Sequence, residues 1–305
     1  MAKNNSADDK RNRARENARQ IAANQAKKEK TAKTILYVGI AVVVVVVLAV
    51  VGVLIFQQNK PAVSPENYVA DGLTVGKDNT PVQPLKMPEG EESDLPAPSE
   101  AGANENAATV TVYIDFQCPG CKAFEEGNSS MLKKLADEGT IVVDYKPVSF
   151  LDRMSSGNEY STRSANLAAC VVDSQPEVAV DLFDALFAQQ PEEGGDGRTD
   201  AELLKVAEDA GVDTSKALSA DPEQTVESCV SEKTFEKFVE QSSQNALDSG
   251  VEATPWVLIN GEKTENTSDS QALATEILKA AGEIKGCGTR ALAALASGVG
   301  RSASS

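Results

Sequence analysis

Histidine is absent from this sequence of 305 residues. Because imidazole serves as the general base of a catalytic triad and as a common metal ligand, its absence excludes Ser-His-Asp catalysis and every site that needs an imidazole. Aromatic residues are also scarce, at 5% of the chain, and Trp256 is the single tryptophan. We expect Trp256 to pack in the core or in a loop, so other residue types must carry the chemistry.

Basic residues are outnumbered, with 29 Lys and Arg against 46 Asp and Glu, and the net charge is −17. The deficit lies in one part of the chain. Residues 1–34 carry a balance of +6, whereas residues 57–305 carry −23. A surface so acidic repels the phosphate backbone of nucleic acids, and we therefore expect no nucleic-acid partner.

Charged residues are missing altogether from one apolar run of 22 residues, Ile35–Phe56. A run of this length crosses the roughly 30 Å hydrocarbon core as a helix. A cleaved signal peptide would have a shorter core followed by a small-residue cleavage site. A buried helix of a soluble domain is the other alternative, and it is disfavoured because the run is dense in valine, apolar all round and flanked by Lys33 on one side only. The run is therefore predicted to be a single transmembrane signal anchor. The positive-inside rule places residues 1–34 in the cytoplasm and the remainder outside the cell membrane.

Two further stretches lack the periodicity of a folded domain. Residues 57–105 are rich in Pro, Glu and Ser and are predicted to form an extracytoplasmic linker. Within them, Tyr68–Gly76 is expected to be a short extended segment that packs on the domain. The last residues, 285–305, are rich in Gly, Ala and Ser and are predicted to be a flexible tail, with no role assigned to Cys287.

The remaining sequence has the pattern of an α/β domain. Ala108–Phe116 alternates apolar and polar residues and is rich in β-branched side chains, which predicts a strand. A helical segment opens at "CPGC", and a second strand, Thr140–Phe150, follows it. Strand, helix and strand in this order imply a right-handed parallel crossover.

The second half of the domain begins with helices and ends with a hairpin. Residues of about 152–250 have helical patterns and form a predicted insertion. "ATPWVLINGEKTEN" then predicts a strand and an antiparallel partner joined at Asn260–Gly261, because Asn-Gly suits a two-residue turn. Ser270–Ile284 is predicted to be an amphipathic closing helix.

Cys118 and Cys121 stand one helical turn apart at the start of the first helix of the domain. The unpaired N–H groups and the positive end of the helix dipole there favour a thiolate, so Cys118 is the predicted nucleophile and Cys121 its partner. A static disulfide closing so small a loop would add little stability, and a zinc site would need a second close pair. Redox exchange is therefore the favoured function, without a metal or other cofactor. Asp115 is either a proton acceptor near the buried sulfur or a cap for the following helix.

These motifs together resemble those of a known family. Cys-Pro-Gly-Cys at the first helix and Thr-Pro before the hairpin resemble the thioredoxin fold of the DsbA-like thiol:disulfide oxidoreductases. The anchor, "DFQCPGCKAFE", "KPVSFLD" and "ATPWVLINGE" are similar to the membrane-anchored actinobacterial type. The resemblance implies a thioredoxin-like domain over residues 106–284. Many DsbA-like enzymes have a histidine between the two cysteines, where this chain has Pro-Gly.

The resemblance also implies roles for residues outside the first motif. It implies a cis peptide bond at Thr254–Pro255, in a loop against the sulfurs that pairs with extended substrates; an ordinary trans turn proline is the alternative. Cys170 and Cys229 lie in the helical insertion. A structural disulfide is favoured for an extracytoplasmic domain and is frequent among the actinobacterial relatives, and two separate buried thiols are the alternative.

The predicted function is that of a membrane-tethered oxidase that introduces disulfides into reduced secreted proteins. The resemblance implies reoxidation by a DsbB- or VKOR-like membrane partner. A reductase or isomerase would use the same residues in another direction, because the reduction potential and not the motif sets direction. A non-enzymatic envelope adaptor with a dormant disulfide is the third alternative.

Overall fold

A computed structural model of the chain describes residues 16, 44–47, 62–82 and 98–282. By internal contacts the chain forms two units, Met1–Pro61 and Ala62–Ser305. In the first unit the described residues are helical. Most of the predicted anchor and basic segment, and all of the predicted tail with Cys287, lie outside the described residues. Within the described part of the chain, no helix has both the length and the hydropathy that a membrane span requires.

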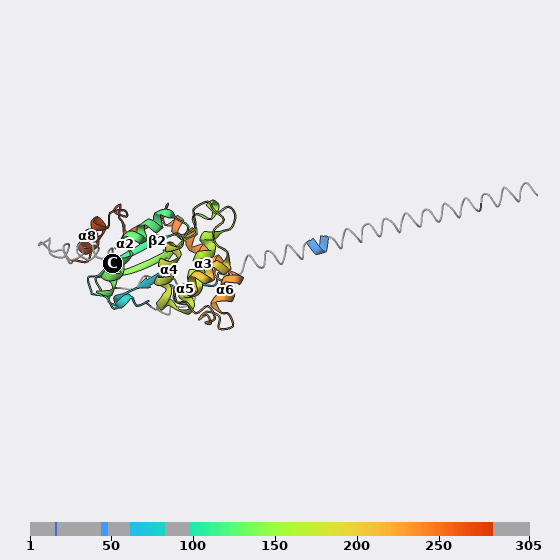
Figure 1. Cartoon of the computed structure of the whole chain (residues 1–305), viewed down its shortest axis with the longest axis horizontal. Coiled ribbons are helices and arrows are strands. Elements are labelled where there is room, and N and C mark those ends of the chain that lie inside the picture. Colours follow the sequence, from blue (N-terminus) through green and yellow to red (C-terminus); the bar gives the residue numbers. More distant parts are fainter. Residues whose placement is uncertain (1–15, 17–43, 48–61, 83–97, 283–305) are drawn as a thin grey trace, which may run out of the picture. The chain divides into compact units, whose positions relative to one another are not determined.

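The second unit contains a five-stranded sheet with helices around it (Figure 1). Its strands are ordered β1-β3-β2-β4-β5 and are bounded as follows: β1 Leu73–Val75, β2 Ala108–Ile114, β3 Ile141–Pro147, β4 Trp256–Ile259 and β5 Glu262–Lys263. β2 and β3 are parallel, whereas β1, β4 and β5 are antiparallel to their neighbours. The predicted parallel crossover and closing hairpin are therefore confirmed.

The centre of the core is the apolar face of β2. Val110, Val112 and Ile114 alternate along this strand and are fully buried, as their spacing of two residues predicts. At the hairpin, Asn260 and Gly261 have φ angles of 51° and 84°, the left-handed values that a two-residue turn of this type requires at both positions.

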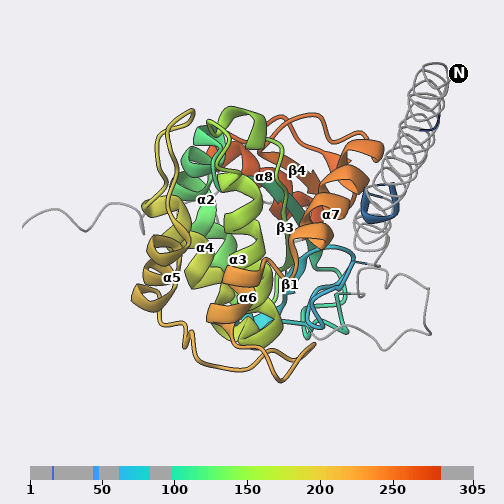
Figure 2. The same ribbon diagram turned by 90° about the vertical axis from the view of Figure 1, so that its right-hand side faces the viewer.

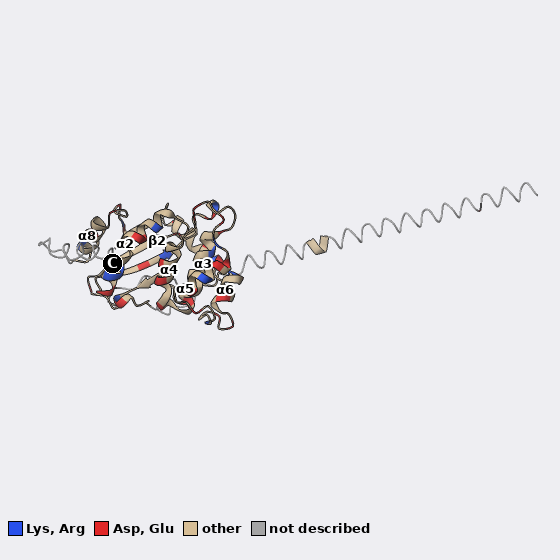
Figure 3. Ribbon diagram, in the orientation of Figure 1, with Lys and Arg blue, Asp and Glu red and all other residues tan. Residues whose placement is uncertain are grey.

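Helices flank the sheet and fill the insertion. They are bounded as follows: α2 Pro119–Asp137, α3 Tyr160–Ser174, α4 Ala179–Ala188, α5 Asp200–Asp209, α6 Val226–Glu232, α7 Glu236–Asp248 and α8 Ser270–Ala280. Three single turns, Lys77–Asn79, Asp152–Met154 and Pro176–Val178, complete the described structure. Figure 2 shows α3 among the other helices of the insertion, and α3 contacts α4, α5, α6 and α7. Figure 3 marks the charged residues on these helices.

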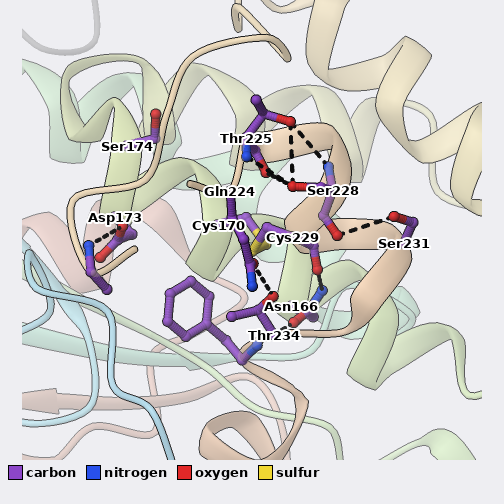
Figure 4. The surroundings of a disulfide bond; sticks show 12 residues. Asn166, Cys170, Asp173, Ser174, Gln224, Thr225, Ser228, Cys229, Ser231 and Thr234 are labelled. Atoms are coloured by element: carbon purple, nitrogen blue, oxygen red, sulfur yellow. Dashed lines mark hydrogen bonds between the residues drawn. A yellow bond between two sulfur atoms is a disulfide. The ribbon is translucent and has the colours of Figure 1, made fainter. Parts of the chain in front are cut away.

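A disulfide between Cys170 and Cys229 joins α3 to α6 inside the insertion (Figure 4). The two Cα atoms are 6.1 Å apart, and both residues are completely buried. Asn166 supports the same junction, because its side chain donates to the carbonyl of Cys229 and accepts the N–H of Phe235. The favoured disulfide pairing is confirmed.

The folded unit extends into the range predicted as a linker. β1 pairs with β3 in antiparallel register, with Leu73 opposite Tyr145 and Val75 opposite Val143. Leu73 and Val75 are buried, so this short strand adds apolar surface to the core. The predicted linker of residues 57–105 therefore includes residues that belong to the folded domain. The expectation that Tyr68–Gly76 packs on the domain is confirmed.

Candidate active site

The two clustered cysteines lie where β2 passes through a short turn into α2. Cys118 is the N-cap of α2, with extended backbone angles, and Pro119 occupies the first helical position, where no N–H is needed. Cys118 is 8% exposed and Cys121 is completely buried. Pro119 and Gly120 between them are exposed, so the outer sulfur lies just beneath the protein surface.

The loop that precedes β4 comes from far along the chain and meets this helix start. The Thr254–Pro255 peptide bond is cis, as the resemblance implies. The Sγ atom of Cys118 lies 3.2 Å from the carbonyl oxygen of Thr254. A Cβ atom at Gly120 would lie 3.3 Å from Cδ of Pro255 and 3.6 Å from Sγ of Cys118. Glycine at this position therefore permits the close approach of the proline loop.

The two thiols have opposite proton affinities. The hydrogen bond from the Cys121 thiol is the largest cause that lowers the pKa of Cys118 from 9.0 to about 6, against the opposing effect of burial. The backbone N–H groups of Cys121 and Gly120 lower it further. Burial raises the pKa of Cys121 well above its ordinary value. Both cysteines are free thiols, so near neutral pH this reduced site holds a thiolate at Cys118 and a protonated Cys121.

Asp115 holds the turn before the helix. One of its carboxylate oxygens accepts the N–H of Gln117 at 2.8 Å and the hydroxyl of Ser161 at 2.7 Å, and the other accepts the N–H of Leu151 at 2.9 Å. Burial raises the pKa of Asp115 to about 6. The predicted capping alternative is wrong, because Cys118 is the N-cap and no side chain caps α2.

Gln190, just after α4, also holds this turn and was not identified from the sequence. Its side-chain amide donates to the carbonyl oxygens of Phe116 at 2.9 Å and Cys118 at 3.0 Å. The carbonyl of Cys118 also accepts the first N–H of the helix ladder, from Lys122. The helical insertion therefore helps to fix the backbone of the redox turn. Nothing in the pattern around Gln190 marks it, because the contact depends on the tertiary fold.

Trp256 follows the cis proline and packs beside a small apolar cluster, as predicted. Its ring is partly buried against this cluster, which contains Val148, Ala246 and Val251. The Nζ atom of Lys263 lies 4.1 Å from the ring centroid, a cation–π contact. The ring is therefore occupied by contacts within the protein.

Comparison with known protein families identifies the family of this chain. The family model described as Thioredoxin matches residues 97–279. The chain belongs to this thioredoxin family. The match begins before β2 and ends in α8, so it contains both cysteines of the first motif and the proline loop.

Curated relatives of this thioredoxin-family chain are of two kinds. The serine/threonine-protein kinase PknE of Mycobacterium tuberculosis is 27% identical over 177 residues, which cover 57% of this chain and 30% of the kinase. The chain thus spans about a third of the length of the first relatives that it matches. Disulfide bond formation protein D of Bacillus subtilis is 27% identical over 186 residues, which cover 61% of this chain and 76% of that protein.

Solved structures of thiol-disulfide oxidoreductases have the same fold. Oxidised DsbA of Mycobacterium tuberculosis has 28% identity and a TM-score of 0.53, with 75% of this chain and 99% of that chain covered. Reduced DsbG of the same organism has 29% identity and a TM-score of 0.54, with 78% and 97% covered. The predicted DsbA-like thioredoxin fold is therefore confirmed.

Proposed function

We propose that this chain is a membrane-tethered, extracytoplasmic thiol:disulfide oxidase that introduces disulfides into secreted proteins. One observation carries the proposal: a low-pKa thiol at a helix start, Cys118, lies against the cis-proline loop with a second thiol one turn away. An activated, reachable sulfur beside a protonated partner is the arrangement that disulfide exchange requires.

The exchange proceeds in two balanced steps. A substrate thiolate attacks Sγ of Cys118 in the oxidised pair, forms a mixed disulfide and releases Cys121 as a thiolate that takes up a proton. The second substrate thiol, after losing its proton, attacks the substrate sulfur of the mixed disulfide. This attack breaks the mixed disulfide and releases Cys118 as a thiolate, so the substrate gains a disulfide and the enzyme ends reduced, with a thiolate at Cys118 and a thiol at Cys121.

The stability of the reduced site supports the proposed direction of transfer. A thiolate favoured at Cys118 stabilises the reduced form, and a stabilised reduced form makes the oxidised form a stronger oxidant. The backbone of Thr254 next to Pro255 lies beside the same sulfur, in position to pair with an extended substrate chain.

The proposed location rests on the sequence and on the chemistry of the insertion. The apolar run at 35–56 after a basic segment supports a signal anchor with its N-terminus in the cytoplasm. A disulfide between Cys170 and Cys229 suits an oxidising compartment. Catalytic turnover then needs an electron acceptor, and we propose a DsbB- or VKOR-like membrane protein.

Oxidative refolding of a reduced, disulfide-containing secreted protein tests the activity. The full-length chain in its oxidised form should restore the native disulfides, and Cys118→Ser should not. Equal results for both proteins would favour an adaptor with a dormant disulfide. Measurement of the reduction potential tests the direction, since a potential well below that of the glutathione couple would instead make the chain a reductase.

A further inference from the structure

A cavity of about 390 Å³ opens on the side of the domain where α7 faces β3 and the chain before β1. Neither Cys118 nor Cys121 lines it, and its lining includes Asp71, Tyr113, Lys146, Ser242, Asn245 and Asp248. The redox chemistry gives this cavity no role.

One polar group in the cavity wall has no hydrogen-bond partner among the residues that the structure describes. Ser242 is 5% exposed, and its hydroxyl forms no hydrogen bond with any described residue. A buried hydroxyl without a partner lowers the stability of the folded state, because its hydrogen bonds to water are lost and not replaced. Ser242 lines the cavity, and rotation of its side chain toward the cavity would let a ligand there hydrogen-bond to the hydroxyl and remove this cost.

The ammonium of Lys146 is already used by the protein. It forms an ion pair with the fully buried Asp144 at 3.4 Å and donates to the carbonyl of Ala70. The charges of Lys146 and Asp144 therefore offset each other. Asp71 and Asp248 at the cavity then leave an excess of negative charge.

The two acidic residues at the cavity keep acceptor capacity. One oxygen of Asp71 accepts the Asn245 side chain at 3.0 Å, and one oxygen of Asp248 accepts Gln244 at 2.8 Å, which leaves a second oxygen on each carboxylate. Burial raises the pKa of the Tyr113 hydroxyl, and the negative charges of Asp144 and Asp71 raise it further. The ring of Tyr113 suits the methylene stem of a long basic side chain, in a lining that is otherwise mostly polar.

We propose that this cavity binds an ammonium or guanidinium group, with the cation beside Asp71 and Asp248 and a donor on the Ser242 hydroxyl. Two sources share this chemistry, a Lys or Arg side chain of a polypeptide and a free small amine. The cavity adjoins Val148 and Ala246, which belong to the same apolar cluster as Trp256 next to the cis proline. An extended polypeptide is therefore the source that we expect.

Calorimetric titration of the full-length chain in detergent tests this proposal. The probes are the tripeptide acetyl-Ala-Lys-Ala-amide, the matched norleucine tripeptide, the matched glutamate tripeptide and n-butylammonium. The lysine tripeptide should bind, more weakly at high salt, and the norleucine and glutamate peptides at least tenfold more weakly. Tighter binding of the lysine tripeptide than of n-butylammonium identifies a polypeptide as the source, and equal binding identifies a small amine.

Two substitutions and a control separate the cavity from the rest of the surface. Asp71→Asn should weaken binding of the lysine tripeptide at least fivefold, and asparagine tolerates the positive φ of 66° at this position. Ser242→Ala should also weaken it while leaving the fold intact, because alanine favours helices and the hydroxyl has no hydrogen-bond partner in the described part of the chain. Asp78→Asn, at a positive φ outside the cavity, is the matched control. Equal binding of the lysine and norleucine peptides, or no effect of Asp71→Asn, would overturn the proposal.

Discussion

The side-chain amide of Gln190 lies 3.0 Å from the carbonyl oxygen of Cys118, the residue that begins the active-site helix. The same amide reaches the carbonyl of Phe116, so a single side chain from the insertion spans both ends of the turn. This contact couples the helical insertion to the position of the reactive sulfur.

Gln190→Ala should lower the turnover of oxidative refolding several-fold. The two lost hydrogen bonds should reduce the free energy of unfolding by about 1–3 kcal/mol. A positioning role also predicts a shift in the pH midpoint of Cys118 alkylation, which a general loss of stability would not produce. Gln244→Ala, on the exposed face of α7, is the control. An unchanged midpoint and turnover would contradict this role.

Gly120→Ala should slow reaction at Cys118 several-fold while leaving the melting temperature nearly unchanged. The added methyl would lie 3.3 Å from Pro255 and 3.6 Å from the Cys118 sulfur. It would therefore hinder the access of a substrate thiol to this sulfur without entering the core. Single-turnover rates with a fluorescent thiol substrate measure the effect. Gly127→Ala, on the same helix with its nearest contact at 3.4 Å to Ser270, is the matched control.

Alkylation of the reduced chain by iodoacetamide should follow the Cys118 thiolate. Because the pKa of Cys118 is lowered to about 6, the rate should be half-maximal near pH 6, fall below it and level off above pH 7. Cys121→Ala removes the largest cause of this lowering and should move the midpoint upward. Cys121→Ser keeps a hydroxyl donor and should move it less. A wild-type midpoint near 9 would contradict the assignment of the nucleophile.

Glu125 is a buried acid whose charging should cost stability. Burial and then the nearby Asp184 raise its pKa from 4.5 to about 8, so the folded state holds the proton more tightly than the unfolded state. The stability that the tighter binding of this proton provides is therefore full below pH 4.5 and is lost as the pH rises through about 8. Glu125→Gln should be more stable than wild type at pH 8, by on the order of 1–3 kcal/mol, and should lose this advantage at pH 4. Urea unfolding at both pH values measures this, and an equal difference at the two would refute it.

Cys170→Ser with Cys229→Ser should reduce the free energy of unfolding without abolishing thiol exchange. The disulfide closes a loop with a sequence separation of 59 residues, for which the chain-entropy estimate is about 4 kcal/mol. Thermal unfolding and the refolding assay, compared with wild type, give the two readouts. A complete loss of exchange in a folded double variant would show that the disulfide also takes part in the chemistry.

Local patterns were sufficient to predict the elements that meet at the site. The alternation in β2, Pro119 after Cys118 and the Asn-Gly turn each specify local backbone geometry, and the structure has these features where they were expected. The cis bond at Pro255 came from resemblance, since an X-Pro dipeptide alone favours trans.

Long-range contacts were not predictable in the same way. Gln190 reaches the redox turn across 72 residues, and Ser161 reaches Asp115 across 46. Ser161 is a polar residue in α3 and Gln190 is a polar residue just after α4, and an exposed position is the ordinary expectation for both. β1 lies inside the segment expected to pack on the domain, but it is only three residues long, too short for its own periodicity to predict its pairing with β3.

The linked cysteines of the insertion are completely buried, whereas Cys118 borders solvent. A mild water-soluble reductant should therefore reduce a disulfide between Cys118 and Cys121 and leave the Cys170–Cys229 disulfide intact. Maleimide mass tagging after denaturation without reductant can then record the oxidation state of each molecule, because reduced Cys118 and Cys121 take up two tags that their disulfide does not.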